Sequence, residues 1–249
     1  MDKGSWIWMD GEFVPWDEAN VHVLTHTLHY GFGVFEGIRC YRQDDGSTAI
    51  FRLEDHNRRL FDSAHILGLP IPFSRDEVYQ ACIETVERNG LEEGYLRPLV
   101  FNGAGEMGLA VLNKVRVSIA CWPWGAYLGE DAAQKGIRVK TSSFSRVHSN
   151  TLMSKSKAVG LYINSILAAH EAHDAGYDEA LLLDTAGFAA EGPGENLFVV
   201  RDGEILTPSA ESILPGITRD TVIGLLREGG YSVREERISR DQIYVADEA

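Results

Sequence analysis

The stretch Ser154-Lys-Ser-Lys157-Ala-Val-Gly-Leu-Tyr162 decides how the rest of the chain is interpreted. Lys157 precedes Tyr162 by five residues (162 − 157) and Glu191 by 34 residues (191 − 157). Glu191 opens the turn Glu-Gly-Pro-Gly-Glu-Asn-Leu-Phe, and a further glycine turn, Leu214-Pro-Gly-Ile-Thr218, follows it. An amine condenses with an aldehyde, a carboxylate keeps a pyridine nitrogen protonated, and a helix N-terminus receives a phosphate. The order of these groups therefore predicts a site for pyridoxal phosphate.

Lys157 needs support beyond its identity, because most lysines of soluble proteins are solvated surface charges. The residues 158–160 that follow it are small enough to let a flat ring lie against the backbone, and the helix beyond them is apolar. Burial of such a lysine would lower the pKa of its amine and leave a nucleophile. Lys155, two residues upstream, is the competing candidate.

The other groups also have simpler explanations. Tyr162 is either a half-buried helix aromatic or a phenol that hydrogen-bonds the ring oxygen of the cofactor. Thr218 is either an N-cap or a hydroxyl that contacts the phosphate together with the N–H groups of Ile217 and Thr218 itself, and the two interpretations are compatible. Glu195 competes with Glu191 for the pyridine contact, since both lie in the same turn.

The totals exclude several classes of protein. The chain has 249 residues, of which 44% are apolar and 24% are charged, values typical of a soluble globular protein. Its net charge of −14 argues against a nucleic-acid or anionic-membrane partner, although a few local donors still suffice to bind a small anion. The three cysteines lie far apart and have no metal-ligand spacing, which indicates reduced thiols. Because no signal peptide or membrane span is recognisable, we expect a cytoplasmic protein. Because no metal-ligand spacing is recognisable, we expect no metal site.

Hydrophobic periodicity and turn residues predict two α+β domains. The sequence contains no internal repeat and no low-complexity tract. The N-terminal domain is predicted at 1–121, the linker at 122–135, and the C-terminal domain at 136–249. The predicted elements are a hairpin over 6–14 around Asp10-Gly11, helices over 53–68, 74–89 and 158–175 and from Thr218, strands over 95–102, 115–121, 137–143, 179–184 and 231–237, and a hairpin around Asp202-Gly203.

The first half also contains the apolar and aromatic stretch His29-Tyr-Gly-Phe-Gly-Val-Phe-Glu-Gly-Ile-Arg-Cys-Tyr41. Composition alone is compatible with an ordinary core segment that carries a bulge. Together with the turns described above, however, this stretch resembles the fold-type IV pyridoxal-phosphate enzymes, specifically the branched-chain amino acid aminotransferases of the class IV aminotransferase family. The resemblance covers nearly the whole chain from about Trp6, and Trp124-Gly-Ala-Tyr-Leu-Gly129 favours these aminotransferases over their relatives.

The resemblance implies a two-domain α+β architecture of the D-amino acid aminotransferase type, with pyridoxal 5'-phosphate bound by the C-terminal domain. It selects Lys157 over Lys155 as the catalytic lysine, Glu191 over Glu195 as the pyridine partner, and Arg59 over Arg58 as a phosphate contact. Glu195 and Asn196 are then structural support. The implied cofactor-binding residues are Arg59, Tyr162, Glu191, Leu214, Gly216, Ile217 and Thr218, and the implied substrate-binding residues are Tyr30, Phe35, Gly37, Tyr95, Arg97, Trp124 and Tyr127.

The implied reaction is ping-pong transamination of leucine, isoleucine or valine with 2-oxoglutarate, giving 2-oxo acids and L-glutamate. Lys157 would hold the cofactor as an internal aldimine and then move the α-proton of the substrate. One pocket must accept apolar side chains and the distal carboxylate of glutamate, which explains an arginine such as Arg97 among aromatic residues. A homodimer or larger homo-oligomer is implied.

Alternatives of the same fold are a D-amino acid aminotransferase and an aminodeoxychorismate lyase, and an alternative of another class is an inactive binding or assembly module. Members of the family continue for several dozen residues beyond the segment 239–249, with a further strand, a phosphate-contacting turn and a closing helix. We therefore expect the C-terminal domain to be incomplete in this chain.

Overall fold

The computed structural model describes residues 3–125 and 132–249. It divides the chain into two compact units, of which the first contains residues 1–129 and 156–160 and the second contains residues 130–155 and 161–249. The short stretch that carries Lys157 thus packs with the first unit. The domain boundaries at 121 and 135 stay a prediction.

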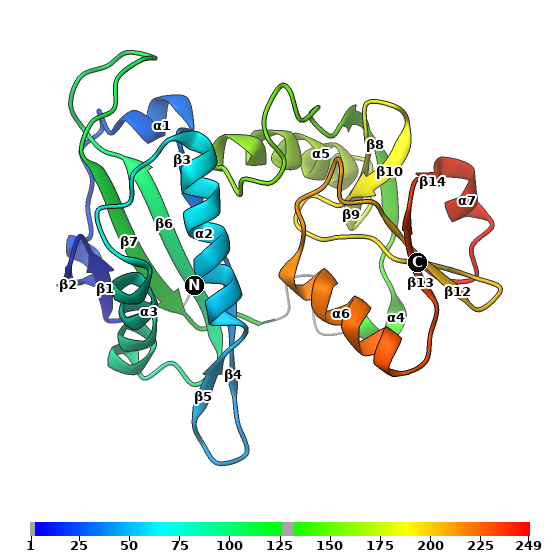
Figure 1. Cartoon of the computed structure of the whole chain (residues 1–249), viewed down its shortest axis with the longest axis horizontal. Coiled ribbons are helices and arrows are strands. Elements are labelled where there is room, and N and C mark those ends of the chain that lie inside the picture. Colours follow the sequence, from blue (N-terminus) through cyan, green and yellow to red (C-terminus); the bar gives the residue numbers. More distant parts are fainter. Residues whose placement is uncertain (1–2, 126–131) are drawn as a thin grey trace. The chain divides into compact units, whose positions relative to one another are not determined.

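The first unit is an antiparallel sheet covered by two helices (Figure 1). The strands pair in the order β2-β1-β7-β6-β4-β5, and β3 also pairs with β6. The helices α2 and α3 pack against each other and against strands of this sheet. The elements are β1 (Trp6–Met9), β2 (Glu12–Pro15), η1 (Trp16–Glu18), α1 (His26–Tyr30), β3 (Gly33–Phe35), β4 (Ile38–Arg42), β5 (Thr48–Ile50), α2 (Leu53–Leu67), α3 (Arg75–Asn89), β6 (Gly94–Asn102) and β7 (Val115–Trp122).

Local sequence signals explain most of these elements. The β1–β2 turn has positive φ angles at Asp10 (54°) and Gly11 (103°), as a tight hairpin requires. Ser74 and Glu77 form a capping box at the start of α3, and α2 ends at Gly68 in the left-handed conformation. Alternate residues of β6 and β7 are fully buried, and burial of each Val, Leu or Ile contributes roughly 1.5–3 kcal/mol.

The second unit contains two smaller sheets, with strand orders β14-β10-β9-β8 and β11-β12-β13. The helix α5 packs on β8 and β9, and its small buried residues Ala168 and Ala172 allow the close approach. The elements are α4 (Ala132–Lys135), β8 (Val139–Ser145), η2 (Val159–Leu161, shared with the first unit), α5 (Tyr162–Asp174), β9 (Glu179–Leu183), β10 (Phe188–Glu191), β11 (Val199–Arg201), β12 (Glu204–Pro208), α6 (Ile217–Glu228), β13 (Val233–Glu236), β14 (Ile238–Ser239) and α7 (Arg240–Tyr244).

Two features differ from the sequence-based expectations, and a third was not predicted. The helix expected over 158–175 begins as the 3-10 turn η2, and several of its apolar residues are exposed. Thr218 is not an N-cap, because α6 begins at Ile217 and its N-cap is Gly216. The stretch 29–41 forms the end of α1 and the strands β3 and β4, which places Glu36 and Gly37 between two strands. No helix among the described residues is long and apolar enough to cross a membrane.

Candidate functional site

Lys157 is fixed by backbone contacts within the first unit. Its N–H donates to Oγ of Ser63 (3.0 Å), and its carbonyl accepts from the N–H of Phe35 (3.1 Å). The Nζ atom lies 5.1 Å from the centroid of the Phe35 ring. Burial lowers the pKa of this amine to about 8, while Glu36 raises that pKa and Arg59 lowers it further. Lys157 is thus a buried amine with an increased neutral fraction at moderately alkaline pH.

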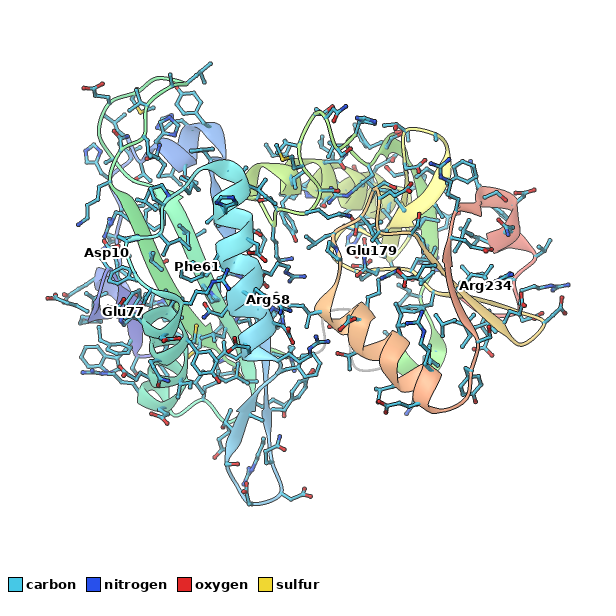
Figure 2. The ribbon with its side chains drawn as sticks, viewed as in Figure 1. Asp10, Arg58, Phe61, Glu77, Glu179 and Arg234 are labelled. Carbon is cyan, nitrogen blue, oxygen red and sulfur yellow. The ribbon has the colours of Figure 1, made fainter. Side chains whose placement is uncertain are left out.

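Arg59 and Arg58 are neighbours on α2 with opposite environments. Arg58 is exposed and pairs with Asp55 (2.6 Å), whereas the Arg59 side chain is 13% exposed. Figure 2 labels Arg58 on this helix. Nε and Nη2 of Arg59 donate to the two carboxylate oxygens of Glu36 at 2.7 and 2.8 Å. Arg59 is therefore the arginine that the fold buries and orients.

The predicted substrate residues Phe35, Tyr95 and Arg97 lie together. The guanidinium carbon of Arg97 is 4.7 Å from the Phe35 ring centroid and 5.2 Å from the Tyr95 ring centroid. Nε of Arg97 is buried and has no hydrogen-bond partner among the described residues. A Cβ atom at Gly37 would lie 1.7 Å from Oη of Tyr95, so Gly37 provides the space for this hydroxyl. These residues form an aromatic cage around one cation.

The remaining predicted substrate residues are distributed differently. The Trp124 ring packs edge-on against Tyr95, with centroids 4.6 Å apart, so it lies beside the aromatic cage. Tyr30 lies at the end of α1, is 44% exposed, and packs against His26 (4.5 Å). Its described ring contacts do not include Phe35 or Tyr95. Tyr127 lies outside the described residues.

Glu191 is held in the second unit by several donors. Nε of Arg146 donates to Oε1 (2.5 Å), Nδ2 of Asn196 donates to Oε2 (3.1 Å), and the N–H of Leu214 donates to Oε2 (3.2 Å). Both Glu191 and Arg146 are less than a tenth exposed. Leu214 thus lies at the carboxylate predicted to face the pyridine nitrogen. The sequence analysis did not identify Arg146, because nothing in its local sequence distinguishes it from the other arginines. In the structure it directly follows β8.

Glu195 differs from Glu191 although both lie in one turn. Burial raises the pKa of Glu195 to about 7, and the nearby carboxylates of Glu179 and Glu191 add to this increase. The N–H of Gly194 donates to Glu195 Oε2 (3.0 Å). Glu191 is thus the carboxylate bound by a buried arginine, and Glu195 is the one beside like charges.

The turn that the sequence analysis predicts to contact a phosphate lies at the start of α6. Gly216 is the N-cap without a side-chain capping bond, and the exposed Thr218 is the second residue of the helix. A Cβ atom at Gly216 would lie 2.0 Å from Oδ1 of Asn196, so this close approach requires glycine. The first N–H groups of a twelve-residue helix favour an anion. Tyr162 begins α5 and is half-buried, and Lys155 donates to the carbonyl of Ile213 (3.3 Å).

The groups found in each unit are of the kinds that pyridoxal phosphate requires. The first unit contains the amine of Lys157 and the guanidinium of Arg59, both largely shielded from solvent, and the second unit contains the buried carboxylate of Glu191 and the N-terminus of α6. Nη1 of Arg146 is a buried donor without a partner among the described residues, as is Nε of Arg97. No group of three or more potential metal ligands occurs among the residues that the structure describes.

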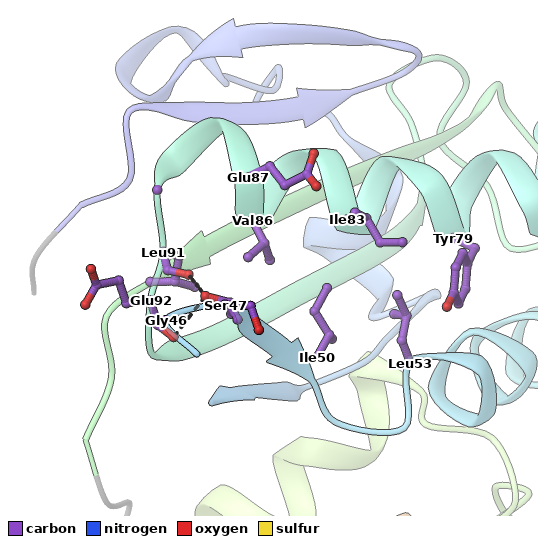
Figure 3. A pocket seen from close by; sticks show the side chains of 12 residues that line it. Gly46, Ser47, Ile50, Leu53, Tyr79, Ile83, Val86, Glu87, Leu91 and Glu92 are labelled. Carbon is purple, nitrogen blue, oxygen red and sulfur yellow. Dashed lines mark hydrogen bonds between the residues drawn. The ribbon is translucent and has the colours of Figure 1, made fainter. Parts of the chain in front are cut away.

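A surface cavity of about 580 Å³ lies elsewhere in the first unit, between α3 and β5 (Figure 3). Its walls include Ile50, Tyr79, Ile83 and Val86, and Glu87 and Glu92 also line it. None of the predicted site residues lines this cavity.

The chain is similar to a known protein family and to individual proteins of that family. The family model described as amino-transferase class IV matches residues 33–249. A branched-chain-amino-acid aminotransferase of Pseudomonas aeruginosa is 54% identical over 249 residues, which are 100% of this chain and 81% of that protein.

Two solved structures of branched-chain amino acid aminotransferases are also similar. The crystal structure of the Escherichia coli protein has a TM-score of 0.95 and 46% identity, and the comparison covers 98% of this chain and 81% of that one. The structure of the T.th. protein, complexed with N-(5'-phosphopyridoxyl)-L-glutamate, has a TM-score of 0.94 and 46% identity, and the comparison covers 99% of this chain and 81% of that one. The fold-type IV architecture and the resemblance to branched-chain aminotransferases are thereby confirmed, and the chain belongs to the class IV aminotransferase family.

Proposed function

We propose that this chain transfers the amino group of branched-chain L-amino acids to 2-oxoglutarate with pyridoxal 5'-phosphate as its cofactor. The observation that carries the proposal is the buried amine of Lys157, which lies against Phe35 beside the caged guanidinium of Arg97. The similar proteins named above support it, since they are branched-chain aminotransferases and one was solved with a phosphopyridoxyl derivative of glutamate.

Lys157 acts as the amine that binds the cofactor and as the base that moves the α-proton. Its pKa of about 8 leaves a useful neutral fraction near that pH, whereas an ordinary lysine is almost fully protonated. When bound, pyridoxal phosphate supplies an aldehyde for condensation with the amino group and a ring that accepts the electrons left by the α-proton.

The other predicted residues bind and orient. Arg59 and the N–H groups of Ile217 and Thr218 bind the phosphate, and Glu191 pairs with the pyridine nitrogen. Tyr162 donates to the ring oxygen, while Leu214 and Gly216 contribute through the backbone of the turn that precedes α6. These roles rest on the resemblance together with the burial and hydrogen bonds described above.

Arg97 and the rings around it explain how one pocket accepts two kinds of substrate. The faces of Phe35, Tyr95 and Trp124 provide apolar walls for leucine, isoleucine or valine. The guanidinium of Arg97 pairs with the distal carboxylate of glutamate or 2-oxoglutarate. Gly37 keeps the position of the Tyr95 hydroxyl open.

The test is an absorbance spectrum of the purified 249-residue chain with pyridoxal phosphate, before and after addition of L-leucine. We expect a bound-cofactor band that shifts with L-leucine but not with D-leucine, and formation of glutamate from 2-oxoglutarate. Lys157→Ala should lower turnover by about 10⁴-fold or more, whereas Lys155→Ala should retain most of it. A spectrum identical to that of free cofactor would contradict the proposal. Loss of activity in Lys155→Ala alone would transfer the catalytic role to Lys155.

Exposed apolar residues support a homo-oligomer. The helix α1 lies beside the β6–β7 connection, because His26 N–H donates to the carbonyl of Gly103 (3.1 Å). Exposed apolar side chains occur just before α1, on α1, on the β6–β7 connection and on α5; they include Val23 (71%), Leu28 (63%), Leu109 (87%) and Ile163 (63%). Such patches are typical of interfaces. Sedimentation of the chain and of Leu109→Glu tests this proposal, since a monomeric chain would contradict it. We also propose a cytoplasmic location.

A further inference from the structure

The first unit contains a buried carboxylate, Glu36, to which the proposed reaction assigns no role. Glu36 lies between β3 and β4, and its side chain is 0% exposed. Its N–H donates to the carbonyl of Pro98 (2.9 Å), which fixes the backbone at this position. Two site residues flank it in sequence, Phe35 on one side and Gly37 on the other. Burial of a charged carboxylate costs free energy unless the carboxylate is paired, so the partners of Glu36 indicate its role.

The partners of Glu36 are two residues on one face of α2. Nε and Nη2 of Arg59 donate to Oε1 and Oε2, and Nδ1 of His56 lies 2.7 Å from Oε2. Burial alone would raise the pKa of Glu36, but the hydrogen bonds from Arg59 and His56 outweigh it and lower the pKa to about 2. Glu36 is therefore held in its charged form near neutral pH.

The fork-shaped contact determines the orientation of Arg59. An arginine side chain carries about 2 kcal/mol of rotamer entropy, and bidentate pairing with a carboxylate fixes both the position and the plane of its guanidinium. A donor that is already fixed binds an anion without the ordering cost that a mobile side chain would incur. The same carboxylate also lies near Lys157, because the N–H of the adjacent Phe35 donates to the Lys157 carbonyl (3.1 Å), and the negative charge of Glu36 raises the pKa of the Lys157 amine.

We propose that Glu36 is a positioning residue of the active site, which holds Arg59 in the orientation that binds the cofactor phosphate and supplies the counter-charge for Lys157. This inference rests on the proposed phosphate-binding role of Arg59. It assigns a role to the one acidic residue of the Phe35-Glu-Gly-Ile-Arg39 motif.

The test compares the affinity of the full chain, stripped of cofactor, for pyridoxal phosphate and for pyridoxal. The dissociation constant for pyridoxal divided by that for pyridoxal phosphate measures how much the phosphate contributes to binding; we call this quotient the phosphate ratio. We expect Glu36→Gln to reduce this ratio about tenfold, because glutamine cannot form the charged fork. In the background of Arg59→Met, the same substitution should cause no further reduction, since Glu36 acts through Arg59.

The second readout is the pKa of the Lys157 amine, measured on the same cofactor-free protein by NMR after ¹³C reductive methylation. Loss of the neighbouring negative charge in Glu36→Gln should lower this pKa, which a merely structural role would not do. Glu36→Asp keeps the charge but shortens the side chain. Compared with Glu36→Gln, it should therefore bring the pKa of Lys157 close to that of the unsubstituted chain, while the phosphate ratio should stay reduced. This variant also serves if Glu36→Gln does not fold.

The outcomes that overturn the inference are distinct from failure of the proposed function. An unchanged or increased phosphate ratio in Glu36→Gln, or an equal reduction with and without Arg59, would show that Glu36 does not position Arg59. An unchanged ratio in Arg59→Met would remove the phosphate role of Arg59 and this inference with it. Failure of the unsubstituted chain to bind pyridoxal phosphate at all would instead refute the proposed function.

Discussion

The first unit and the second unit each bury a carboxylate against an arginine, but the second also places two further carboxylates, Glu179 and Glu195, close together. Glu36 of the first unit has Arg59 and His56 as partners, and its pKa is lowered to about 2. In the second unit Glu191 has Arg146, while Glu195 in the same turn lies near Glu179 and has a pKa raised to about 7. Burial by itself raises the pKa of an acid, so the donors that surround it decide whether it stays charged.

The Arg146–Glu191 pair provides the largest test of this comparison. Arg146→Met leaves the buried carboxylate of Glu191 without its cationic partner, so we expect a loss of about 3–5 kcal/mol in the free energy of unfolding. Far-UV circular dichroism during thermal unfolding measures the loss. The double variant Arg146→Met/Glu191→Gln should recover much of it, because no uncompensated charge remains.

The matched control is an exposed arginine of the same unit. Arg234 pairs with Glu204 at 2.8 Å, and both side chains are about half exposed. Figure 2 labels Arg234. Because exposed ion pairs contribute little, Arg234→Met should cost less than about 1 kcal/mol. Equal melting temperatures for Arg146→Met and Arg234→Met would mean that the Arg146–Glu191 pair is not a stabilising contact.

Glu195 provides a smaller effect that depends on pH. Its pKa is raised from 4.5 to about 7, so the folded protein binds a proton that the unfolded chain releases. This contribution to stability is fully present below pH 4.5 and is lost as the pH rises through 7. Above pH 7 we expect Glu195→Gln to be more stable than the unsubstituted chain by up to about 2 kcal/mol, a value reduced for partial exposure.

Melting temperatures of Glu195→Gln and of the unsubstituted chain, compared at pH 5 and pH 8, measure this effect. The difference should be much larger at pH 8 than at pH 5. A difference that is the same at both pH values would show that Glu195 does not titrate between them. Glu204→Gln, an exposed acid of the same unit, is the control and should show little change.

Signals that lie close together in sequence were sufficient to predict most elements of both units. Asp10-Gly11, Asp202-Gly203 and the Ser74 cap lie within the turn or helix end that they specify, and the structure confirms these elements. Confirmation of the family likewise follows from motifs that are continuous in sequence. The cap of α6 was misplaced because Thr218 and Gly216 both belong to residue types that begin helices, and backbone geometry decides between them.

The two buried arginine–glutamate pairs could not be predicted, because their partners are far apart in sequence. Glu36 and Arg59 are separated by 23 residues, and Arg146 and Glu191 by 45. Neither Glu36 nor Arg146 belongs to a sequence pattern that indicates a partner. The packing of α2 brings Arg59 to Glu36, and the pairing of strands in the second unit brings Arg146 to Glu191. Periodicity and motifs thus do not predict ion pairs between residues that are distant in sequence.

The smallest predicted effect concerns the helices that support the two regions. The helices α2 and α3 of the first unit contain no glycine, whereas α6 of the second unit has Gly224 in its interior. A Cβ atom at Gly224 would meet no heavy atom within 4 Å. Gly224→Ala should therefore stabilise the second unit by about 0.5–1 kcal/mol through reduced backbone entropy of the unfolded chain.

The distribution of tryptophan allows this effect to be assigned to one unit. All five tryptophans, Trp6, Trp8, Trp16, Trp122 and Trp124, lie in the first unit, so fluorescence reports its unfolding while circular dichroism reports both units. In urea, Gly224→Ala should raise the midpoint followed by circular dichroism at least as much as the midpoint followed by fluorescence. Destabilisation would contradict the prediction, because a methyl group in open space cannot cause it.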